Sequence, residues 1–490
     1  MVSPESSVPE SAESSASLEP LRSVHTSNFP PLLQELGLSL VVSTYQAGKV
    51  VLVRADGDSL NTHFRLFQKP MGLAIDVQGR MAIGSSARIW EFRNVPDAAP
   101  KLPPRGKHDA CFIPRNMHVT GDIDIHEMAW GNEGLWFVNT RFSCLCTHDL
   151  DHSFVPRWRP PFVTAYAPED RCHLNGLELV DGAPKYVTAL GTTDTAGGWR
   201  ENKARGGMLM DVTTNEFVTQ GLSMPHSPRW YRDRLWVLES GEGSLATVDL
   251  DTGKVEPVVK LPGFTRGLDF YGPLAFVGLS QVRESAVFSG IPLTERVEER
   301  MCGVWVVNID RGEILAYLGF EDAVQEIFAV QVLPGIRFPE LVIEDNEFLK
   351  SSYVLPDEAL AEVAITDTPL TEAQQAFAAA MQAYQSGNLE EAVQYYRQGL
   401  ASNPKNMVAR YQLGVILVDL QQWQAGIDEL TIVVEERTDH AEAHNSLGVA
   451  YLQLQNLEQA RWHFERAIAL NPRFELPRNN LRVLQQMSQQ

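Results

Sequence analysis

The chain has 490 residues, of which 44% are hydrophobic and 21% are charged, a composition typical of soluble folded domains. This length is enough for two or more domains, and the composition excludes a wholly disordered chain, a collagen and a protein with several membrane spans. The 62 acidic and 41 basic residues give a formal net charge of −21. Because phosphate contacts need clustered Lys and Arg, we expect no nucleic-acid partner.

Residues 1–25 contain the stretch MVSPESSVPESAESSASLEP, whose Ser, Glu and Pro content predicts a disordered tail. The stretch lacks the basic and apolar segments of a secretory signal, and no apolar run of the chain approaches the ~20 residues of a membrane span. Five cysteines without a CxxC pair do not indicate a disulfide framework. We therefore expect a cytoplasmic protein without a membrane partner.

Short alternating apolar runs, broken by Gly, Pro, Asp and Asn, fill residues 26–350 and predict an all-β domain. Six units begin with the related segments PMGLAID, IHEMAWG, HLNGLELV, HSPRWYRD, FTRGLDFYG and QEIFAVQVL. The last unit lacks later strands, which LVVSTY, KVVLVRAD and THFRLFQ near the N-terminus can supply. One sheet built from both ends closes a ring, so the pattern predicts a six-bladed β-propeller. A seventh blade is the alternative if IRFPELVIED forms more than an extension.

Two blade starts, Lys69-Pro70-Met71-Gly72 and His173-Leu174-Asn175-Gly176, are similar to the His-Pro-x-Gly start of NHL-repeat blades. The β region thus resembles six-bladed propellers of the NHL and gluconolactonase type. This resemblance implies the same fold and a binding site at the central channel.

Residues 371–490 change to Ala-, Leu-, Gln- and Glu-rich helical stretches after an acidic linker at 351–370. Small residues recur every 34 positions, as at Ala380, Gly414 and Gly448. The stretches YQSGNLEEAVQYYRQGLASNPKN and AHNSLGVAYLQLQNLEQARWHFERAIALNPRF resemble tetratricopeptide repeats. This resemblance implies an all-α solenoid of three repeats with a capping helix. The whole chain is also similar to an uncharacterised bacterial family that joins a propeller to such repeats.

Tetratricopeptide arrays imply a concave groove that binds a protein or peptide partner. The positions expected to face this groove contain no Lys or Arg, which disfavours a clamp for a C-terminal carboxylate. Phe377, Tyr411 and Asn445 are the residues predicted to contact the partner on an apolar and aromatic surface. The alternative is that the repeats only extend a packing surface or dimerise.

A propeller predicts a site at one mouth of its channel, where the starts of the first strands and the loops after the second strands converge. The sequence places polar residues at these points, so we expect a small-molecule or carbohydrate ligand. The residues predicted to bind it are Asn139, Arg141, Asn175, Trp199, Arg200, Glu239 and Arg283. Trp199 and Arg200 lie in the insertion GTTDTAGGWRENKARGG, which is predicted to cover the mouth.

Three histidines, His126, His173 and His226, fall near the channel start of three consecutive units. Three imidazoles with one open position suit a catalytic zinc or a similar divalent ion. The set is similar in kind to the three-histidine zinc site in the propeller of the peptide-amidating lyase family. The alternative is a polar channel that needs no metal cofactor.

Two classes of function follow from this pattern. In the first, the repeats form an interaction scaffold and the propeller mouth binds a ligand. In the second, the propeller is a metal-dependent lyase or hydrolase, and the repeats recruit a partner. Glu127 or Glu326 would then act as a base, and Arg266 or Arg283 would hold an anionic group. The sequence leaves open whether the propeller is an enzyme.

Overall fold

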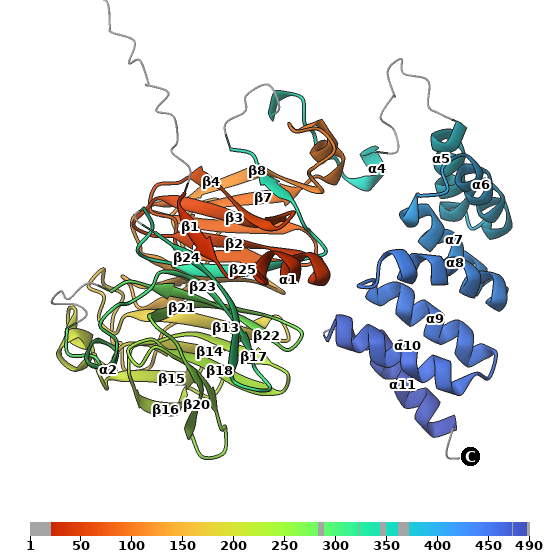
Figure 1. The fold of residues 1–490 in the computed structure, drawn as a ribbon. Coiled ribbons are helices and arrows are strands. Elements are labelled where there is room, and N and C mark those ends of the chain that lie inside the picture. The colour runs from red at the N-terminus through yellow and green to blue at the C-terminus, as the bar shows by residue number, and fades with distance from the viewer. Residues whose placement is uncertain are drawn as a thin grey trace, which may run out of the picture. The chain divides into compact units, whose positions relative to one another are not determined.

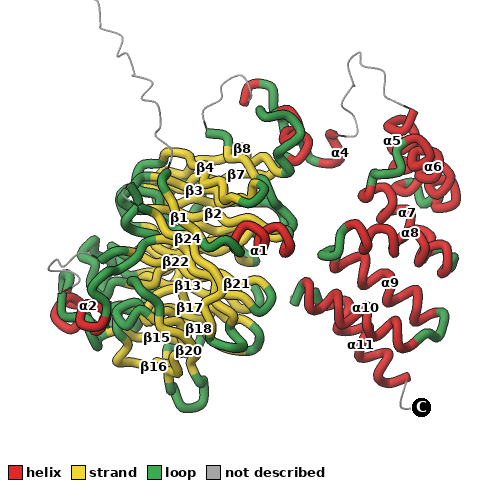
Figure 2. The backbone as a smooth tube through the Cα atoms, in the orientation of Figure 1, coloured by secondary structure: helices red, strands yellow, loops and turns green. Residues whose placement is uncertain are grey.

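A computed structural model of the chain describes residues 21–282, 289–321, 323–343, 349–360, 372–472 and 474–487. The chain divides into one unit that ends at Glu344 and a second that begins at Asp345. The first is built of strands and the second of helices (Figures 1 and 2). The division falls slightly before residue 350, where we expected the propeller to end.

The strands of the first unit form six sheets, which we call blades 1 to 6 (Figure 1). From the innermost strand outward, blade 1 contains β25 (Ala329–Pro334), β2 (Leu38–Thr44), β3 (Lys49–Asp56) and β4 (Ser59–Leu66). Blade 2 contains β5 (Leu73–Ile75), β6 (Arg80–Ser85), β7 (Arg88–Asn94), β8 (Ala110–Val119) and β26 (Pro339–Leu341). Blade 3 contains β9 (Ile125–Gly131), β10 (Gly134–Asn139), β11 (Cys144–Thr147) and β12 (Val155–Trp158).

In the remaining three blades, the first four strands follow one another along the chain from the innermost strand outward. Blade 4 contains β13 (Leu174–Val180), β14 (Ala183–Ala189), β15 (Gly207–Asp211) and β16 (Glu216–Leu222). Blade 5 contains β17 (Pro225–Tyr231), β18 (Arg234–Glu239), β19 (Ser244–Val248) and β20 (Val255–Lys260). Blade 6 contains β21 (Phe264–Tyr271), β22 (Leu274–Ser280), β23 (Gly303–Asn308), β24 (Glu313–Phe320) and β1 (Ser23–His25).

The innermost strands contact one another in the order β5, β9, β13, β17, β21, β25 and back to β5. This ring confirms the prediction of a six-bladed propeller. The alternative of seven blades is wrong, because the described residues of IRFPELVIED add only β26, which pairs in parallel with β8.

Three strand pairings join the two ends of the propeller. The antiparallel pairing of β2 with β25 builds blade 1 from both ends, as the sequence predicts. In addition, β1 pairs with β24, and β26 pairs with β8. Residues 23–25, which we expected in the N-terminal tail, therefore belong to blade 6. Each of these pairings covers a strand edge that would otherwise lack a hydrogen-bonding partner.

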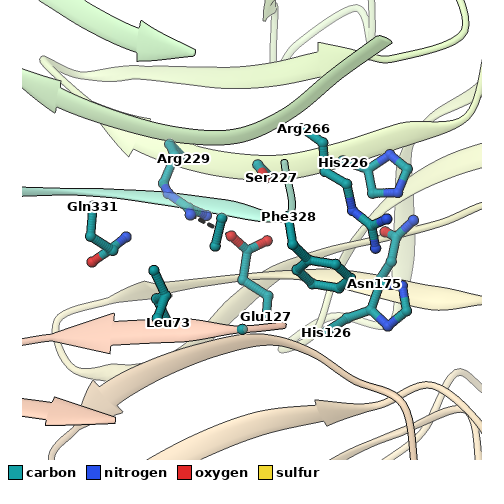
Figure 3. Close-up of a pocket in the computed structure, with 12 residues that line it drawn as sticks. Leu73, His126, Glu127, Asn175, His226, Ser227, Arg229, Arg266, Phe328 and Gln331 are labelled. Carbon is teal, nitrogen blue, oxygen red and sulfur yellow. Dashed lines mark hydrogen bonds and ion pairs between the residues drawn. The ribbon is translucent and has the colours of Figure 1, made fainter. Parts of the chain in front are cut away.

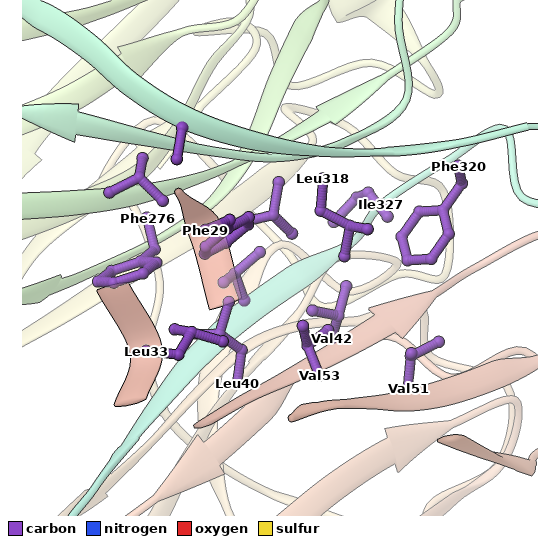
Figure 4. Packing of buried hydrophobic residues seen from close by; sticks show 14 of the residues in the cluster. Phe29, Leu33, Leu40, Val42, Val51, Val53, Phe276, Leu318, Phe320 and Ile327 are labelled. Carbon is purple, nitrogen blue, oxygen red and sulfur yellow. The ribbon is translucent and has the colours of Figure 1, made fainter. Parts of the chain in front are cut away.

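The core consists of apolar layers between neighbouring blades. Between blades 1 and 6, the helix α1 (Phe29–Leu36) inserts Phe29 and Leu33 among side chains such as Val42 and Phe276 (Figure 4). Burying one such side chain contributes roughly 1.5–3 kcal/mol to folding. Three further short helices lie in connections: η1 (Pro96–Lys101), η2 (Gly198–Asn202) and α2 (Pro292–Arg296).

The second unit contains three helix pairs and a final helix, as the 34-residue period predicts. A short helix, α4 (Asp357–Leu360), precedes them within the predicted linker. The pairs are α5 (Glu372–Gln385) with α6 (Leu389–Ser402), α7 (Met407–Asp419) with α8 (Trp423–Glu436), and α9 (Ala441–Gln453) with α10 (Leu457–Leu470), followed by α11 (Glu475–Met487).

The recurring small residues of the second unit have a packing role. A Cβ atom on Gly448 in α9 would lie 2.5 Å from the ring of Phe464 in α10, so only glycine lets these helices approach this closely. Asn406 and Asn456 begin α7 and α10 by accepting hydrogen bonds from Ala409 N at 3.0 Å and Gln459 N at 3.2 Å. In the described part of the chain, no helix is long and apolar enough to cross a membrane.

Candidate functional site at the channel mouth

One residue from each blade reaches the channel at the same level of the propeller. In ring order these residues, which we call the mouth ring, are Gly72, His126, Asn175, His226, Arg266 and Phe328, and all six line one pocket (Figure 3). About 310 Å³ of empty space lies among its lining residues, and this volume includes open solvent outside the pocket. Its other lining residues are Leu73, Glu127, Ser227, Arg229, Ala329 and Gln331.

Hydrogen bonds between blades fix the level of the mouth ring. The carbonyl just before each ring residue accepts a hydrogen bond from the preceding blade. The six acceptors and donors are Met71 O with Ser43 Oγ, Ile125 O with Gly72 N, Leu174 O with Thr140 Oγ1, Pro225 O with Asn175 Nδ2, Thr265 O with Ser240 Oγ, and Ile327 O with Ser280 Oγ. The ring is therefore a repeated feature of the fold.

Breaks in strand pairing turn the ring residues toward the channel. The innermost strands of blades 3 to 6 all shift register at or next to their ring residue, as between Leu174 and Gly176 or between Thr265 and Leu268. A bulge of this kind re-aims one side chain and bends its strand. Gly267 supplies the bend after Arg266, with a φ of 80° that favours glycine.

His126 and His226 are held in the same way on blades 3 and 5. Nδ1 of His126 lies 3.1 Å from Asp124 O and 2.8 Å from Thr140 Oγ1. Nδ1 of His226 lies 3.0 Å from Met224 O and 2.9 Å from Ser240 Oγ. Since a carbonyl can only accept, Nδ1 of each ring carries the proton and donates it.

Both imidazoles are kept uncharged by their surroundings. Burial, followed by the positive charge of Arg266, holds the pKa of His126 well below its usual range. The same two causes hold the pKa of His226 well below its usual range. At neutral pH the mouth ring therefore carries one positive side chain, Arg266, beside two neutral imidazoles.

Arg266 stacks on the neighbouring ring residue. Its guanidinium carbon lies 3.6 Å from the centroid of the Phe328 ring. Burial lowers the pKa of Arg266 to about 10, against the opposing attraction of Glu326, so the group stays charged at neutral pH. Among the described residues no carboxylate forms an ion pair with it. The mouth thus holds a guanidinium whose hydrogen-bonding edge has no acceptor within the described protein.

His173, the third predicted metal ligand, belongs to a different level. It lies two residues before the ring residue Asn175, the position that Asp124 and Met224 occupy in blades 3 and 5. All three have positive φ angles, of 51°, 50° and 47°. The ring centroids of His173 and His126 are still only 4.9 Å apart. The three histidines are therefore neighbours, but they do not occupy equivalent positions around the channel.

A carboxylate and an indole hold His173 at the rim. Its Nδ1 donates to Asp170 Oδ1 at 2.9 Å, and Trp199 Nε1 donates to Asp170 Oδ2 at 2.9 Å. Arg200 lies over the Trp199 ring at 4.4 Å, and the Trp199 ring centroid lies 4.6 Å from that of His173, so the insertion contacts this histidine; that it covers the mouth stays a prediction.

A three-histidine metal site stays a prediction. Within the described ranges, no group of three or more His, Cys, Asp or Glu side chains is placed to hold an ion. The charge of Arg266, which already acts on His126 and His226, would also oppose a divalent cation between them. The geometry therefore fits this cofactor poorly.

Below the mouth ring, the channel is crossed by an ion pair between Glu127 and Arg229 (Figure 3). Burial alone would lower the pKa of Arg229, but the charges of Glu127 and Glu178 raise it. Because Glu127 forms an ion pair with Arg229, its surroundings suit a structural role better than the predicted role of a catalytic base. Glu326 is half-buried and lies two residues before Phe328, close enough to act on Arg266 electrostatically.

The other predicted ligand residues surround the mouth without lining the pocket. Arg141 pairs with Asp122 at 2.7 Å, and Asn139 accepts a hydrogen bond from Phe142 N at 3.0 Å. Glu239 accepts a hydrogen bond from Ser223 N at 3.4 Å, and burial raises its pKa. The predicted residue Arg283 lies outside the described residues.

In the second unit, the three predicted partner-binding residues differ in their surroundings. Phe377 packs against Tyr396, with ring centroids 6.5 Å apart, inside the first helix pair. Tyr411 is half-buried beside His440, and Asn445 accepts a hydrogen bond from Asn480 Nδ2 at 3.1 Å. All three residues are half-buried, and each contacts a neighbouring residue of the helical unit.

Seven residues of the pocket are absent from the set of predicted site residues: Gly72, Leu73, Ser227, Arg229, Phe328, Ala329 and Gln331. In three blades, the spacing between two residues is a signal in the sequence that identifies the ring position. Ring residues on blades 3, 5 and 6 precede a hydroxyl at the end of the second strand by 14 residues, as His126 precedes Thr140 and His226 precedes Ser240. Phe328 lacks this signal because the matching hydroxyl, Ser43, comes from the other end of the propeller.

Family comparisons cover both units. The family model described as "Domain of unknown function (DUF4915)" matches residues 27–342. Two tetratricopeptide repeat models match residues 383–445 and 441–474, which confirms the predicted repeats. No curated protein sequence matches the chain at a significant level.

Solved tetratricopeptide structures are similar to about a quarter of the chain. The first such domain of Spaghetti (RPAP3), bound to the HSP90 peptide SRMEEVD, is 23% identical with a TM-score of 0.24, covering 24% of this chain and 94% of its own. The second domain of human RPAP3, in complex with the HSP70 peptide SGPTIEEVD, is 18% identical with a TM-score of 0.23, covering 23% and 95%. MamA (41-end) from Desulfovibrio magneticus RS-1 is 21% identical with a TM-score of 0.24, covering 24% and 66%.

Proposed function

The chain belongs to the family of the Domain of unknown function DUF4915, whose model spans residues 27–342, and we propose that its propeller binds a small anion at the channel mouth. The observation that carries this proposal is the guanidinium of Arg266. It is stacked on Phe328, faces the pocket and has no ion-pair partner among the described residues. Holding a charge in such a place costs free energy unless a counter-ion supplies the missing interaction.

Neighbouring groups of the mouth ring support an anionic ligand. Asn175 donates one amide hydrogen to Pro225 O at 3.0 Å and accepts from Thr188 Oγ1 at 2.7 Å, which leaves its second amide hydrogen for a ligand. The carboxylate of Glu127 forms its ion pair with Arg229, and it acts on Arg266 only through its charge. A carboxylate or phosphate oxygen could therefore accept from both Arg266 and Asn175.

Titration with propionate, a simple carboxylate, tests the proposal. Calorimetry at low ionic strength should give a dissociation constant in the millimolar range for the full chain. Arg266→Gln should weaken binding at least tenfold because a charge-assisted hydrogen-bond pair is lost. Arg266→Lys should lie between the two, since it keeps the charge and loses the planar fork.

The matched control for Arg266→Gln is Arg232→Gln. Arg232 is a partly exposed arginine on the same unit, 3.5 Å from Asp310. This variant should bind propionate as the unchanged chain does. Equal affinity of the unchanged chain and Arg266→Gln would contradict the proposal.

The tetratricopeptide unit supports protein–protein interaction, and for this chain we propose an apolar and aromatic contact surface. Its first helices expose large apolar side chains, Met381 and Tyr384 on α5 and Val408 on α7, at 54%, 40% and 64% of their surface. Tyr411 lies on the same helix as Val408, three residues on. A peptide with apolar side chains suits these residues better than an acidic C-terminus.

A further inference from the structure

We propose that the ligand of the mouth is a small hydroxy acid, which places its anionic group on Arg266 and donates hydroxyl hydrogen bonds to His126 and His226. This inference rests on the proposed anion binding and names the chemical class of the ligand. It follows from which atoms of the mouth ring can donate a hydrogen bond and which can only accept one.

The first step is the position of the proton on each imidazole. The hydroxyl of Thr140 has one hydrogen, which it donates to Leu174 O at 2.6 Å, so towards His126 it can only accept. The hydroxyl of Ser240 likewise donates its hydrogen to Thr265 O at 2.5 Å and can only accept from His226. Each Nδ1 therefore faces two acceptors, a carbonyl and a hydroxyl, and must carry the hydrogen. The lone pair of each neutral ring is then on Nε2.

The second step is the surroundings of the two Nε2 atoms. Both histidines line the pocket, and their Nδ1 edges are bound to their own blades. Across the described ranges, neither Nε2 atom has a hydrogen-bond partner, and neither is sealed from solvent. The mouth thus offers a ligand two acceptors that are fixed in direction, on the two sides of Asn175 in the ring order.

The third step is the kind of donor that fits these acceptors. An ammonium group could also donate to Nε2, but it is positively charged. Arg266 already disfavours positive charge at both imidazoles, so it would disfavour an ammonium there as well. A hydroxyl donates without a charge. The anionic group of the same molecule then pairs with Arg266, which follows His226 directly in the ring.

The fourth step is the size of the ligand. The pocket encloses little space of its own, and the 310 Å³ of empty space among its lining residues runs out into open solvent, so only a small ligand fits between the mouth residues. Phe328 lines the pocket together with Glu127 and Arg229, which form an ion pair (Figure 3). A three-carbon acid with two hydroxyls has one anionic group for Arg266 and one donor for each histidine.

The experiment compares three acids of equal carbon number on the full chain: propionate, glycerate and alanine. Glycerate should bind at least tenfold more tightly than propionate, because each well-placed hydrogen bond adds severalfold in affinity. Alanine should bind no more tightly than propionate. If propionate binds and glycerate binds no better, the hydroxyl assignment is overturned while anion binding stands. If none of the three binds, anion binding itself fails. Tighter binding of alanine than of glycerate would overturn the hydroxyl in favour of an ammonium group.

Two variants test the histidines separately. His126→Phe and His226→Phe keep an aromatic ring and remove the lone pair, so each should cut the preference for glycerate over propionate to about threefold. The matched control is His152→Phe, an exposed histidine on a loop, which should keep the full preference. A full preference in both mouth variants would overturn the inference.

A measurement on the unchanged chain does not depend on how the variants fold. Nitrogen NMR of ¹⁵N-labelled histidine should show hydrogen on Nδ1 and a bare Nε2 for the rings of His126 and His226. Glycerate should shift these Nε2 signals, and propionate should leave them nearly in place. Hydrogen on Nε2 of either ring in the free protein would contradict the inference.

Discussion

At the scale of single residues, Arg229 shows how the propeller stabilises the base of its pocket. The side chain starts on blade 5, pairs with Glu127 of blade 3 and donates through Nε to Leu268 O of blade 6 at 3.0 Å. Nη1 lies 3.5 Å from Leu177 O of blade 4. One guanidinium therefore connects four blades around the channel.

Removing this guanidinium should destabilise the propeller strongly. In Arg229→Met, the mostly buried carboxylate of Glu127 loses its cation and keeps only the hydrogen bond from Leu177 N at 3.4 Å, so we expect a loss of about 3–5 kcal/mol in the free energy of unfolding. Urea unfolding followed by tryptophan fluorescence measures the change. The double variant Arg229→Met with Glu127→Met should recover part of the loss, because neither charge is then unpaired.

A surface arginine provides the control for this prediction. Arg232→Met, at a partly exposed residue, should change the free energy of unfolding by less than about 1 kcal/mol. If Arg229→Met lies within this range as well, the ion pair does not have the structural role described.

All four polar residues of the mouth ring could be predicted from the sequence, because they lie at recognisable strand starts. His126, Asn175, His226 and Arg266 were all identified in this way. Aligned on the apolar strands of the sequence, the three histidines already differ in register by one or two residues, and in the structure His173 lies two residues before the ring residue Asn175. Phe328 was missed because an aromatic residue at a strand start is typical of a core.

At the scale of strands, β26 shows how a short element can join two blades. It pairs with β8 of blade 2, while its Glu340 contacts side chains of blade 1. Arg65 Nη2 lies 2.8 Å and His63 Nε2 lies 3.0 Å from Glu340 Oε1, and Arg54 Nη1 lies 3.4 Å from Oε2. The carboxylate is nearly buried, with 8% of its side chain exposed, so these contacts are shielded from solvent.

This carboxylate should make stability depend on pH in the acid range. Burial alone would raise the pKa of Glu340, but the hydrogen bond with His63 and the charges of Arg65 and Arg54 lower it to about 2. Below pH 4.5 the unfolded chain takes up a proton at this residue and the folded chain does not, so acid favours unfolding. The contribution is therefore complete above pH 4.5 and is lost as the pH falls to about 2.

The variant Glu340→Gln tests this dependence. The difference in free energy of unfolding between the unchanged chain and the variant should shrink by about 2–3 kcal/mol between pH 6 and pH 2. The control Glu256→Gln changes an exposed carboxylate beside Lys254 and should show a small, nearly constant difference. A difference for Glu340→Gln that does not vary with pH would contradict the assigned pKa.

The order of strands within the blades could largely be predicted from the sequence. The two short strands that join distant parts of the chain, β1 and β26, could not. The alternation of apolar residues predicts the four-stranded blades and the sharing of blade 1 between both ends. Strands β1 and β26 have three residues each, too few for a periodic pattern. Their pairing depends on tertiary contacts, such as those of Glu340, that only the folded chain brings together.

At the scale of the whole molecule, the two units have different sources of stability. All three pairings that close the propeller lie between residues 23 and 341. The helical unit is stabilised by contacts between consecutive helices, as solenoids are. Both patterns were visible in the sequence, because one period is two residues and the other is 34. The boundary between the units was less sharp, since the linker has no period of its own.

A chain that ends at residue 344 should therefore fold and keep the mouth. It retains β25 and β26, so blade 1 is complete and no inner strand loses its partner. Its affinity for propionate should lie within about twofold of the affinity of the full chain. The six residues of the mouth ring and the three strand pairings that join the ends of the propeller are unchanged. A chain that ends at residue 324 is the control. It lacks β25, which leaves the inner edge of β2 unpaired and removes Phe328, so we expect it not to fold. Loss of anion binding in the longer fragment, with its circular dichroism unchanged, would show that the mouth depends on the helical unit and would contradict the assignment of the site to the propeller alone.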